Sequence, residues 1–199
     1  MKKMRGKIIL IVAVLFVVVI GVSLIVGYNS LVNENEEIDS NFANVNNVLI
    51  SRHDKITQLV ATVNGLQDHA ENIYNAITSA REAYAAAQAN GTVGEIAEAD
   101  ALESLAITDL VAFMLVEDNP EITATSAYNS LMDEIASTEN ELKIARKDYN
   151  DSVEEYMKSI KKFPKLLYAG IFGFEKQKEY WKINDGQNEI PPMVFGNEE

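Results

Sequence analysis

The fold is decided by residues 38–84, which read IDSNFANVNNVLISRHDKITQLVATVNGLQDHAENIYNAITSAREAY. Apolar residues recur there at alternating steps of four and three, which is the spacing of a heptad seam. The seam consists of Ile38, Phe42, Val45, Leu49, Arg52, Ile56, Leu59, Val63, Leu66, Ala70, Ile73, Ile77, Ala80 and Tyr84. Between Tyr28 and Asn90 there is no proline and a single glycine, Gly65. The pattern predicts one long helix that packs a continuous stripe against other helices.

Arg52 is the one charged residue on this seam. A cation inside a helical core is costly unless it is paired, so a carboxylate or a tyrosine from another helix is its expected partner. Close by, Asp54 and Thr57 could cap a new helix start. The long helix is therefore either continuous or kinked at residues 51–57.

Two further helices follow the loop at residues 90–94. The first covers 95–117 through Ile96, Ala99, Leu102, Ala106, Leu110 and Phe113, and it ends because Asn119 precedes Pro120. The second begins near Thr123 or Thr125 and ends at Pro164. Its seam reads Tyr128, Leu131, Ile135, Thr138, Leu142, Ala145, Tyr149, Ser152, Tyr156, Ser159 and Phe163. Residues 165–181 form a shorter amphipathic segment.

The chain begins with a basic tail, residues 1–7, and an uncharged apolar run, residues 8–26. At ~1.5 Å per residue this run reaches roughly 28 Å, enough to cross a bilayer. It is longer than the apolar core of a cleaved signal and lacks a small-x-small cleavage site, so we favour an uncleaved anchor. The four early cations predict a cytoplasmic N-terminus and an extracytoplasmic remainder at the cell membrane.

These elements predict an all-α fold: an N-terminal transmembrane helix followed by an antiparallel four-helix bundle with one long first helix. The bundle domain would cover residues 28–183, built from three long helices and the short C-terminal one. Residues 184–199 lack periodicity and are expected to form a flexible tail.

The charge balance excludes nucleic acid as a partner. All 30 acidic residues follow the apolar run, and the whole chain carries a net charge of −13. Such a surface repels phosphate backbones. The absence of cysteine also excludes disulfides and thiol catalysis.

No pattern for catalysis, cofactor binding or metal binding is found in the sequence. His53 and His69 have no second histidine at helical spacing, and HExxH and glycine-rich phosphate loops are missing. We interpret both histidines as solvated surface residues. The segment 148–156 has oxygen ligands at alternate positions but lacks the central glycine of a calcium loop. The chain is therefore expected not to be an enzyme and to need no cofactor or metal.

Lysines gather in the last third of the acidic chain. They could form a docking surface for an acidic partner or lipid headgroups, or they could neutralise carboxylates on neighbouring helices. The group comprises Lys158, Lys161, Lys162, Lys165, Lys176, Lys178 and Lys182.

Several segments resemble the LemA family: YNSLV after the anchor, SRHDKITQLVATVNG, the AR at 80–81, the block from Asn119 to Pro164, and a GF followed by YW. Relatives commonly have a proline at the position of Thr57 and an arginine at that of His53, which bears on the shape of a kink. The family motif consists of packing and capping residues, so it implies structural or interaction roles and no catalytic ones. The candidates are Arg52, Asp54, Arg81, Arg146, Tyr149, Asn150, Tyr156, Phe163 and Pro164.

The resemblance implies an anchored helical bundle of bacterial membranes without established enzymatic activity. A membrane zinc protease is a frequent genomic companion of the family and is therefore a candidate partner. Our first hypothesis is a scaffold or adaptor that presents acidic extracytoplasmic surface to protein partners, with homo-oligomerisation left open. The alternatives are an extracytoplasmic small-ligand sensor acting through a membrane partner and, with least support, a hydrolase using scattered carboxylates.

Overall fold

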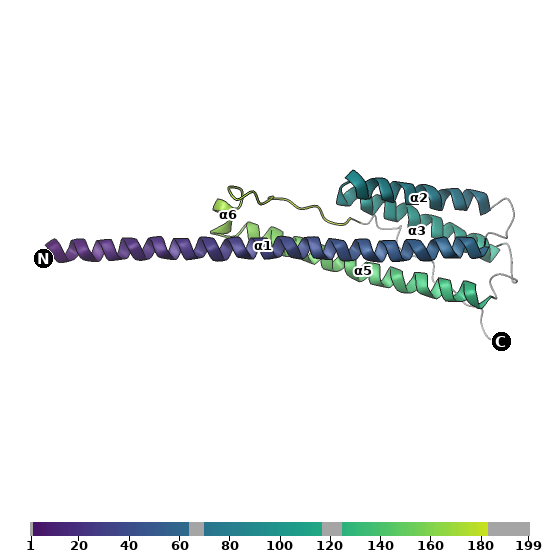
Figure 1. Cartoon of the computed structure of the whole chain (residues 1–199), viewed down its shortest axis with the longest axis horizontal. Coiled ribbons are helices and arrows are strands. Elements are labelled where there is room, and N and C mark those ends of the chain that lie inside the picture. Colours follow the sequence, from purple (N-terminus) through teal and green to yellow (C-terminus); the bar gives the residue numbers. More distant parts are fainter. Residues whose placement is uncertain (1, 64–69, 117–124, 183–199) are drawn as a thin grey trace. The chain divides into compact units, whose positions relative to one another are not determined.

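The structure, a computed structural model, describes residues 2–63, 70–116 and 125–182 and contains no strand among them. Its helices in chain order are α1 (Lys2–Val63), α2 (Ala70–Asn90), α3 (Val93–Val116), α5 (Ser126–Ile160) and α6 (Lys165–Tyr168) (Figure 1). The all-α prediction is therefore confirmed.

The helices form two compact units. The N-terminal unit comprises the described residues of Met1–Asn41 and Asn150–Lys178, and the bundle unit those of Phe42–Tyr149 and Glu179–Glu199. Helices α1 and α5 each contribute to both units.

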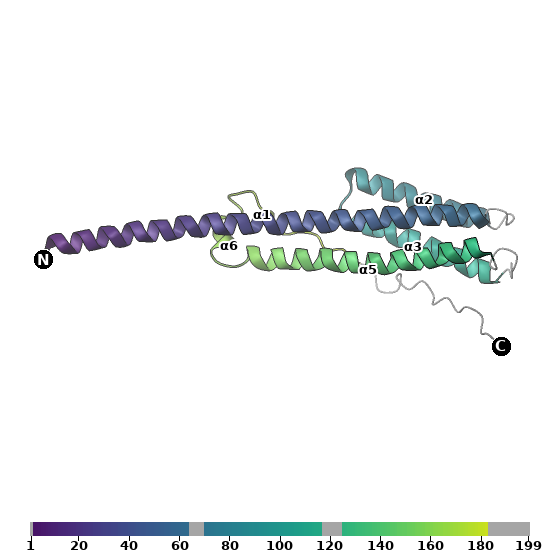
Figure 2. The ribbon, with the colours of Figure 1, turned by 60° about the horizontal axis from the view of Figure 1, so that its bottom comes forward.

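The bundle unit is an antiparallel arrangement of α1, α2, α3 and α5. Tyr84 of α2 donates a hydrogen bond to Asn46 of α1 (3.4 Å), and farther along α1, Ile56 belongs to the same core cluster as Ile77, so these helices run in opposite directions. Helix α2 lies beside α3 in both views of the ribbon (Figures 1 and 2). The predicted antiparallel four-helix bundle is confirmed.

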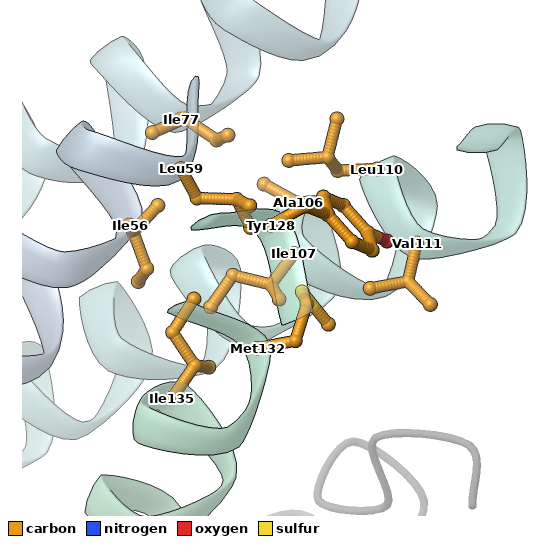
Figure 3. Packing of buried hydrophobic residues seen from close by; sticks show 10 residues of the cluster. All are labelled: Ile56, Leu59, Ile77, Ala106, Ile107, Leu110, Val111, Tyr128, Met132 and Ile135. Atoms are coloured by element: carbon orange, nitrogen blue, oxygen red, sulfur yellow. The ribbon is translucent and has the colours of Figure 1, made fainter. Parts of the chain in front are cut away.

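All four bundle helices contribute to one apolar core. Figure 3 shows its side chains pointing toward one another from the four helices. The cluster comprises Ile56, Leu59, Ile77, Ala106, Ile107, Leu110, Val111, Tyr128, Met132 and Ile135. Each fully buried Leu or Ile contributes about 1.5–3 kcal/mol by leaving water, so this cluster is a major source of the unit's stability.

In the N-terminal unit, polar contacts join α1 to α5 and to the segment around α6. The carboxylate of Glu34 accepts hydrogen bonds from Ser30 (2.7 Å), Ser159 (2.9 Å) and Lys165 (3.0 Å). Burial opposes the charge, but these donors and the ammonium of Lys165 lower the pKa of Glu34. Tyr168 is buried against α1 at Gly27.

By length and composition, α1 is a candidate membrane span near the N-terminus. Its apolar run is not packed in a core, since Phe16 is 64 % and Val17 is 67 % exposed. This exposure distinguishes the run from the buried core helix of a soluble protein.

The prediction of one helix through residue 84 is wrong. Helix α1 ends at Val63 and α2 begins at Ala70, with 64–69 outside the described residues. The seam nevertheless continues in α2, where Ile77 and Ala80 are buried. The heptad register was kept across the break, so periodicity alone did not reveal it.

The fourth helix of the bundle is consequently α2 and not the C-terminal segment. Of residues 165–181, only Lys165–Tyr168 are helical. Helix α5 ends at Ile160, and Phe163, predicted on its seam, is 80 % exposed. All the remaining positions of the predicted seam, from Tyr128 to Ser159, are buried or half-buried.

Helix α1 is unbroken through residues 51–57, so a new cap at Asp54 is not formed. Asp54 is exposed in the helix interior, and the Thr57 hydroxyl donates to the carbonyl of His53 (3.0 Å) within the same helix. The predicted tail at 184–199 and His69 lie outside the described residues.

Candidate functional site

Arg52 is fully buried on the core face of α1 in the bundle unit. Its guanidinium forms ion pairs with Asp100 (2.6 Å) and Glu103 (2.9 Å) of α3 and with Glu139 (2.8 Å) of α5. It also donates a hydrogen bond to the hydroxyl of Ser104 (3.1 Å). Carboxylates from two other helices thus partner this cation, as the sequence predicted.

A second arginine, Arg146 of α5, completes the cluster. It is 3 % exposed, pairs closely with the second carboxylate oxygen of Asp100, and lies 3.5 Å from Glu139. The Trp181 ring, 5.7 Å from the guanidinium, covers it. We call Arg52, Asp100, Glu103, Glu139 and Arg146 the ion-pair cluster.

His53 extends the cluster toward the surface. Its ring Nδ1 lies 2.6 Å from an oxygen of Glu103, and its side chain is 12 % exposed. The prediction of a solvated surface histidine is therefore wrong for His53. Its position next to Arg52 on α1 brings it to the same carboxylate, which spacing between histidines could not reveal.

The electrostatics of the cluster depend on mutual compensation. Burial opposes the charge on Arg52, but the three carboxylates around it raise the pKa of its guanidinium. Burial also opposes the charge on Glu103, yet hydrogen bonding from His53 and the positive charge of Arg52 lower the pKa of that carboxyl. For Asp100 and Arg146 burial dominates: it raises the pKa of the carboxyl and lowers the pKa of the guanidinium.

The ion-pair cluster joins α1, α3 and α5 and leaves none of its three carboxylates without an arginine partner. The carboxylates of Asp100, Glu103 and Glu139 are bound to arginines, and a pairing of this kind satisfies charges that would be very costly in isolation. A slipped register of α1, α3 or α5 would separate the partners. The ion pairs therefore join α1, α3 and α5 in the register that the structure shows.

The other predicted site residues occupy different places. Tyr149 and Tyr156 are buried, and their hydroxyls donate to the carbonyls of Glu179 (2.8 Å) and Glu175 (2.7 Å), so each ties α5 to the chain that follows α6. Asn150 is half-buried on α5, whereas Arg81 of α2 is exposed.

Pro164 is the N-cap residue of α6. It follows the exposed Phe163 in the turn after α5. The structure thus brings Arg52 and Arg146 together and leaves the remaining candidates elsewhere.

Sequence reasoning missed the acidic half of the cluster. Buried α3 positions repeat at steps of four and three through Ile96, Asp100, Glu103, Ile107 and Leu110. The predicted pattern placed Leu102 on this seam in error, since Leu102 is 48 % exposed. The other predicted positions whose burial is described are buried: Ile96, Ala99, Ala106 and Leu110. The sequence does contain a signal for these acids: Asp100 and Glu103 fit the spacing of a helix seam once acidic residues are allowed on it. The need of Arg52 for anionic partners is the reason to allow them.

A shallow groove lies between α2 and α3 on the surface of the bundle unit. Its volume is about 330 Å³, and small residues form most of its lining, with two glutamates. The lining residues are Ala83, Ala86, Ala87, Gly91, Glu95, Glu98, Ala99 and Leu102.

Taken together, these features define an all-α protein with a candidate N-terminal membrane span and an antiparallel four-helix bundle aligned by buried ion pairs. The LemA family model matches residues 41–195, and the chain belongs to the LemA family. This confirms the resemblance. A search of the curated proteins finds no match.

Proposed function

We propose that the protein is a membrane-anchored, non-enzymatic scaffold or adaptor that presents its acidic bundle to protein partners outside the cytoplasm. The observation that carries the proposal is the continuity of α1, in which the apolar run and the first bundle helix belong to one unbroken helix. An anchor of this kind needs no linker. Residues 8–26 contact the lipid bilayer, and the four cations before them hold the N-terminus in the cytoplasm.

The buried ionisable residues support a structural role. Catalytic acids and bases need access to a substrate, whereas the carboxylates of the ion-pair cluster contact arginines. The net charge of −13 favours a partner with a basic surface. A membrane zinc protease, the companion implied by the family resemblance, is the first candidate.

In-cell photo-crosslinking of the full anchored chain tests the proposal. A crosslinking residue is placed at exposed Glu98 of α3 in one strain and at exposed Glu141 of α5 in another. One dominant membrane protein captured from either position supports the adaptor and identifies its partner.

If the purified chain is monomeric and neither position captures a specific neighbour, the scaffold function is excluded. Self-crosslinks alone would instead establish a homo-oligomeric scaffold.

A small-ligand sensor is the second candidate, and the α2–α3 groove of about 330 Å³ is the observation that favours it. In that case a metabolite would raise the melting temperature of the full chain. Ala86→Leu, at an exposed position in the lining of the groove, would fill the groove and abolish the shift. A screen in which no compound stabilises the chain would contradict this candidate.

A further inference from the structure

An exposed apolar patch surrounds α6 in the N-terminal unit. Five large apolar side chains face solvent within one short stretch of chain. They are Phe163 (80 %), Leu166 (53 %), Leu167 (65 %), Ile171 (81 %) and Phe172 (50 %). We call these residues the α6 patch. Exposed apolar side chains concentrated in this way mark an interaction surface.

The α6 patch is held against the part of α1 that directly follows the apolar run. Tyr168 is buried at Gly27, and the ring of Tyr28 contacts those of Phe172 (5.3 Å) and Phe174 (5.5 Å) edge-on. Lys165 donates a hydrogen bond to Ser30 (2.8 Å). These contacts lie within the first two helical turns after Val26, where a span ending there would leave the hydrocarbon.

Basic side chains adjoin the apolar ones. Lys161 and Lys176 line a pocket of about 630 Å³ whose lining also includes the apolar Ile160, Leu166 and Ala169. Apolar side chains next to lysines, with a tyrosine at the end of a span, are the composition of the membrane interface, where rings lie at headgroup level and cations meet phosphates.

We infer that the α6 patch inserts into the interface of the bilayer that residues 8–26 cross, with Lys161 and Lys176 contacting lipid phosphates. The α6 segment would then be a second, peripheral membrane contact. It would limit tilting of α1 at the membrane surface. The inference rests on the proposed anchor, because it needs the end of the span at Val26.

Depth-dependent fluorescence quenching tests the insertion in the full chain. The natural chain has no cysteine, so single-cysteine variants carry one environment-sensitive probe each. They are reconstituted in nanodiscs of phosphatidylcholine and phosphatidylglycerol, with a quencher on the upper part of the acyl chain in one preparation and near its end in another. Ile171→Cys probes the α6 patch, Val17→Cys the apolar run, and Ile144→Cys serves as a matched control because Ile144 is 61 % exposed on α5.

We expect the probe at 171 to emit at shorter wavelength and to lose fluorescence to the quencher, whereas the probe at 144 keeps it. Quenching at 17 without quenching at 171 would overturn the inference and leave the anchor intact, with the patch then facing water or a protein. Equal quenching at 171 and 144 would overturn it as well, because the probe itself would be binding lipid. No quenching at 17 or 171 would refute both the anchor and the inference.

Discussion

At the scale of single residues, Arg52 is a fully buried cation whose charge is balanced by three carboxylates. We expect Arg52→Met to destabilise the full chain by about 3–5 kcal/mol, because those acids would lose their shared partner inside the core. Arg81→Met, on the exposed face of α2, is the matched control and should change stability by less than about 0.5 kcal/mol. Urea unfolding in detergent measures both. Equal midpoints for the two variants would refute the structural role of the cluster.

The lowered pKa of Glu103 predicts a pH dependence. A carboxyl whose folded pKa lies below its unfolded value stabilises the fold above the unfolded value, and this contribution is lost as pH falls through the folded pKa. Glu103→Gln should therefore be less stable than the natural chain at neutral pH, by about 1–3 kcal/mol. The difference should shrink at acidic pH, below the ordinary value of 4.5.

Unfolding curves of both proteins at neutral and acidic pH provide the measurement. Glu141→Gln, at an exposed site on α5, controls for the change of net charge. A stability difference for Glu103→Gln that stays constant across this range would contradict the assignment of the lowered pKa to this contact.

At the scale of elements, the attachment of α6 to α1 depends on Gly27. A Cβ atom added at Gly27 would overlap the hydroxyl oxygen of Tyr168 and lie 3.0 Å from its Cζ atom. We expect Gly27→Ala to displace Tyr168 and to increase protease cleavage and amide exchange in residues 161–174. The half-buried Gly21, where an added Cβ meets nothing within 4 Å, provides the control variant Gly21→Ala.

A second-site change makes this prediction specific. The Tyr168 hydroxyl is buried and has no hydrogen-bond partner among the described residues, so its removal costs little. Tyr168→Phe added to Gly27→Ala should restore part of the protection, since Cζ can yield by a few tenths of an ångström. Protection that stays lost in the double variant would show that Gly27 acts in another way.

Sequence reasoning recovered elements better than their partners. The seam of α5 held from Tyr128 to Ser159 because its small and apolar residues follow one period. The break after Val63 was missed because the heptad register continues beyond it in α2. The acids of α3 do not belong to an apolar pattern, and only the need of Arg52 for partners points to them. Pairing between helices is a long-range property. The periodicity of one helix predicts its buried face but not which residues of other helices contact that face.

At the scale of the whole molecule, the chain begins with a basic segment, residues 1–7, and an uncharged apolar run, residues 8–26. The remainder of the chain is acidic. That separation follows from composition, and the all-α class follows from periodicity and agrees with the helices of the structure. The proposed membrane topology is the property that most constrains which partners the bundle can meet. It rests on four early cations and on an apolar run whose side chains are exposed.

This topology predicts where cysteines can be labelled. We expect Glu98→Cys, on the exposed surface of α3, to react with a membrane-impermeant maleimide in intact cells, because the positive-inside rule places everything after residue 26 outside. Lys3→Cys should react only after the membrane is permeabilised. The natural chain, which has no cysteine, gives the background directly. Labelling at 3 but not at 98 in intact cells would mean the opposite orientation, and the acidic bundle would then face cytoplasmic partners.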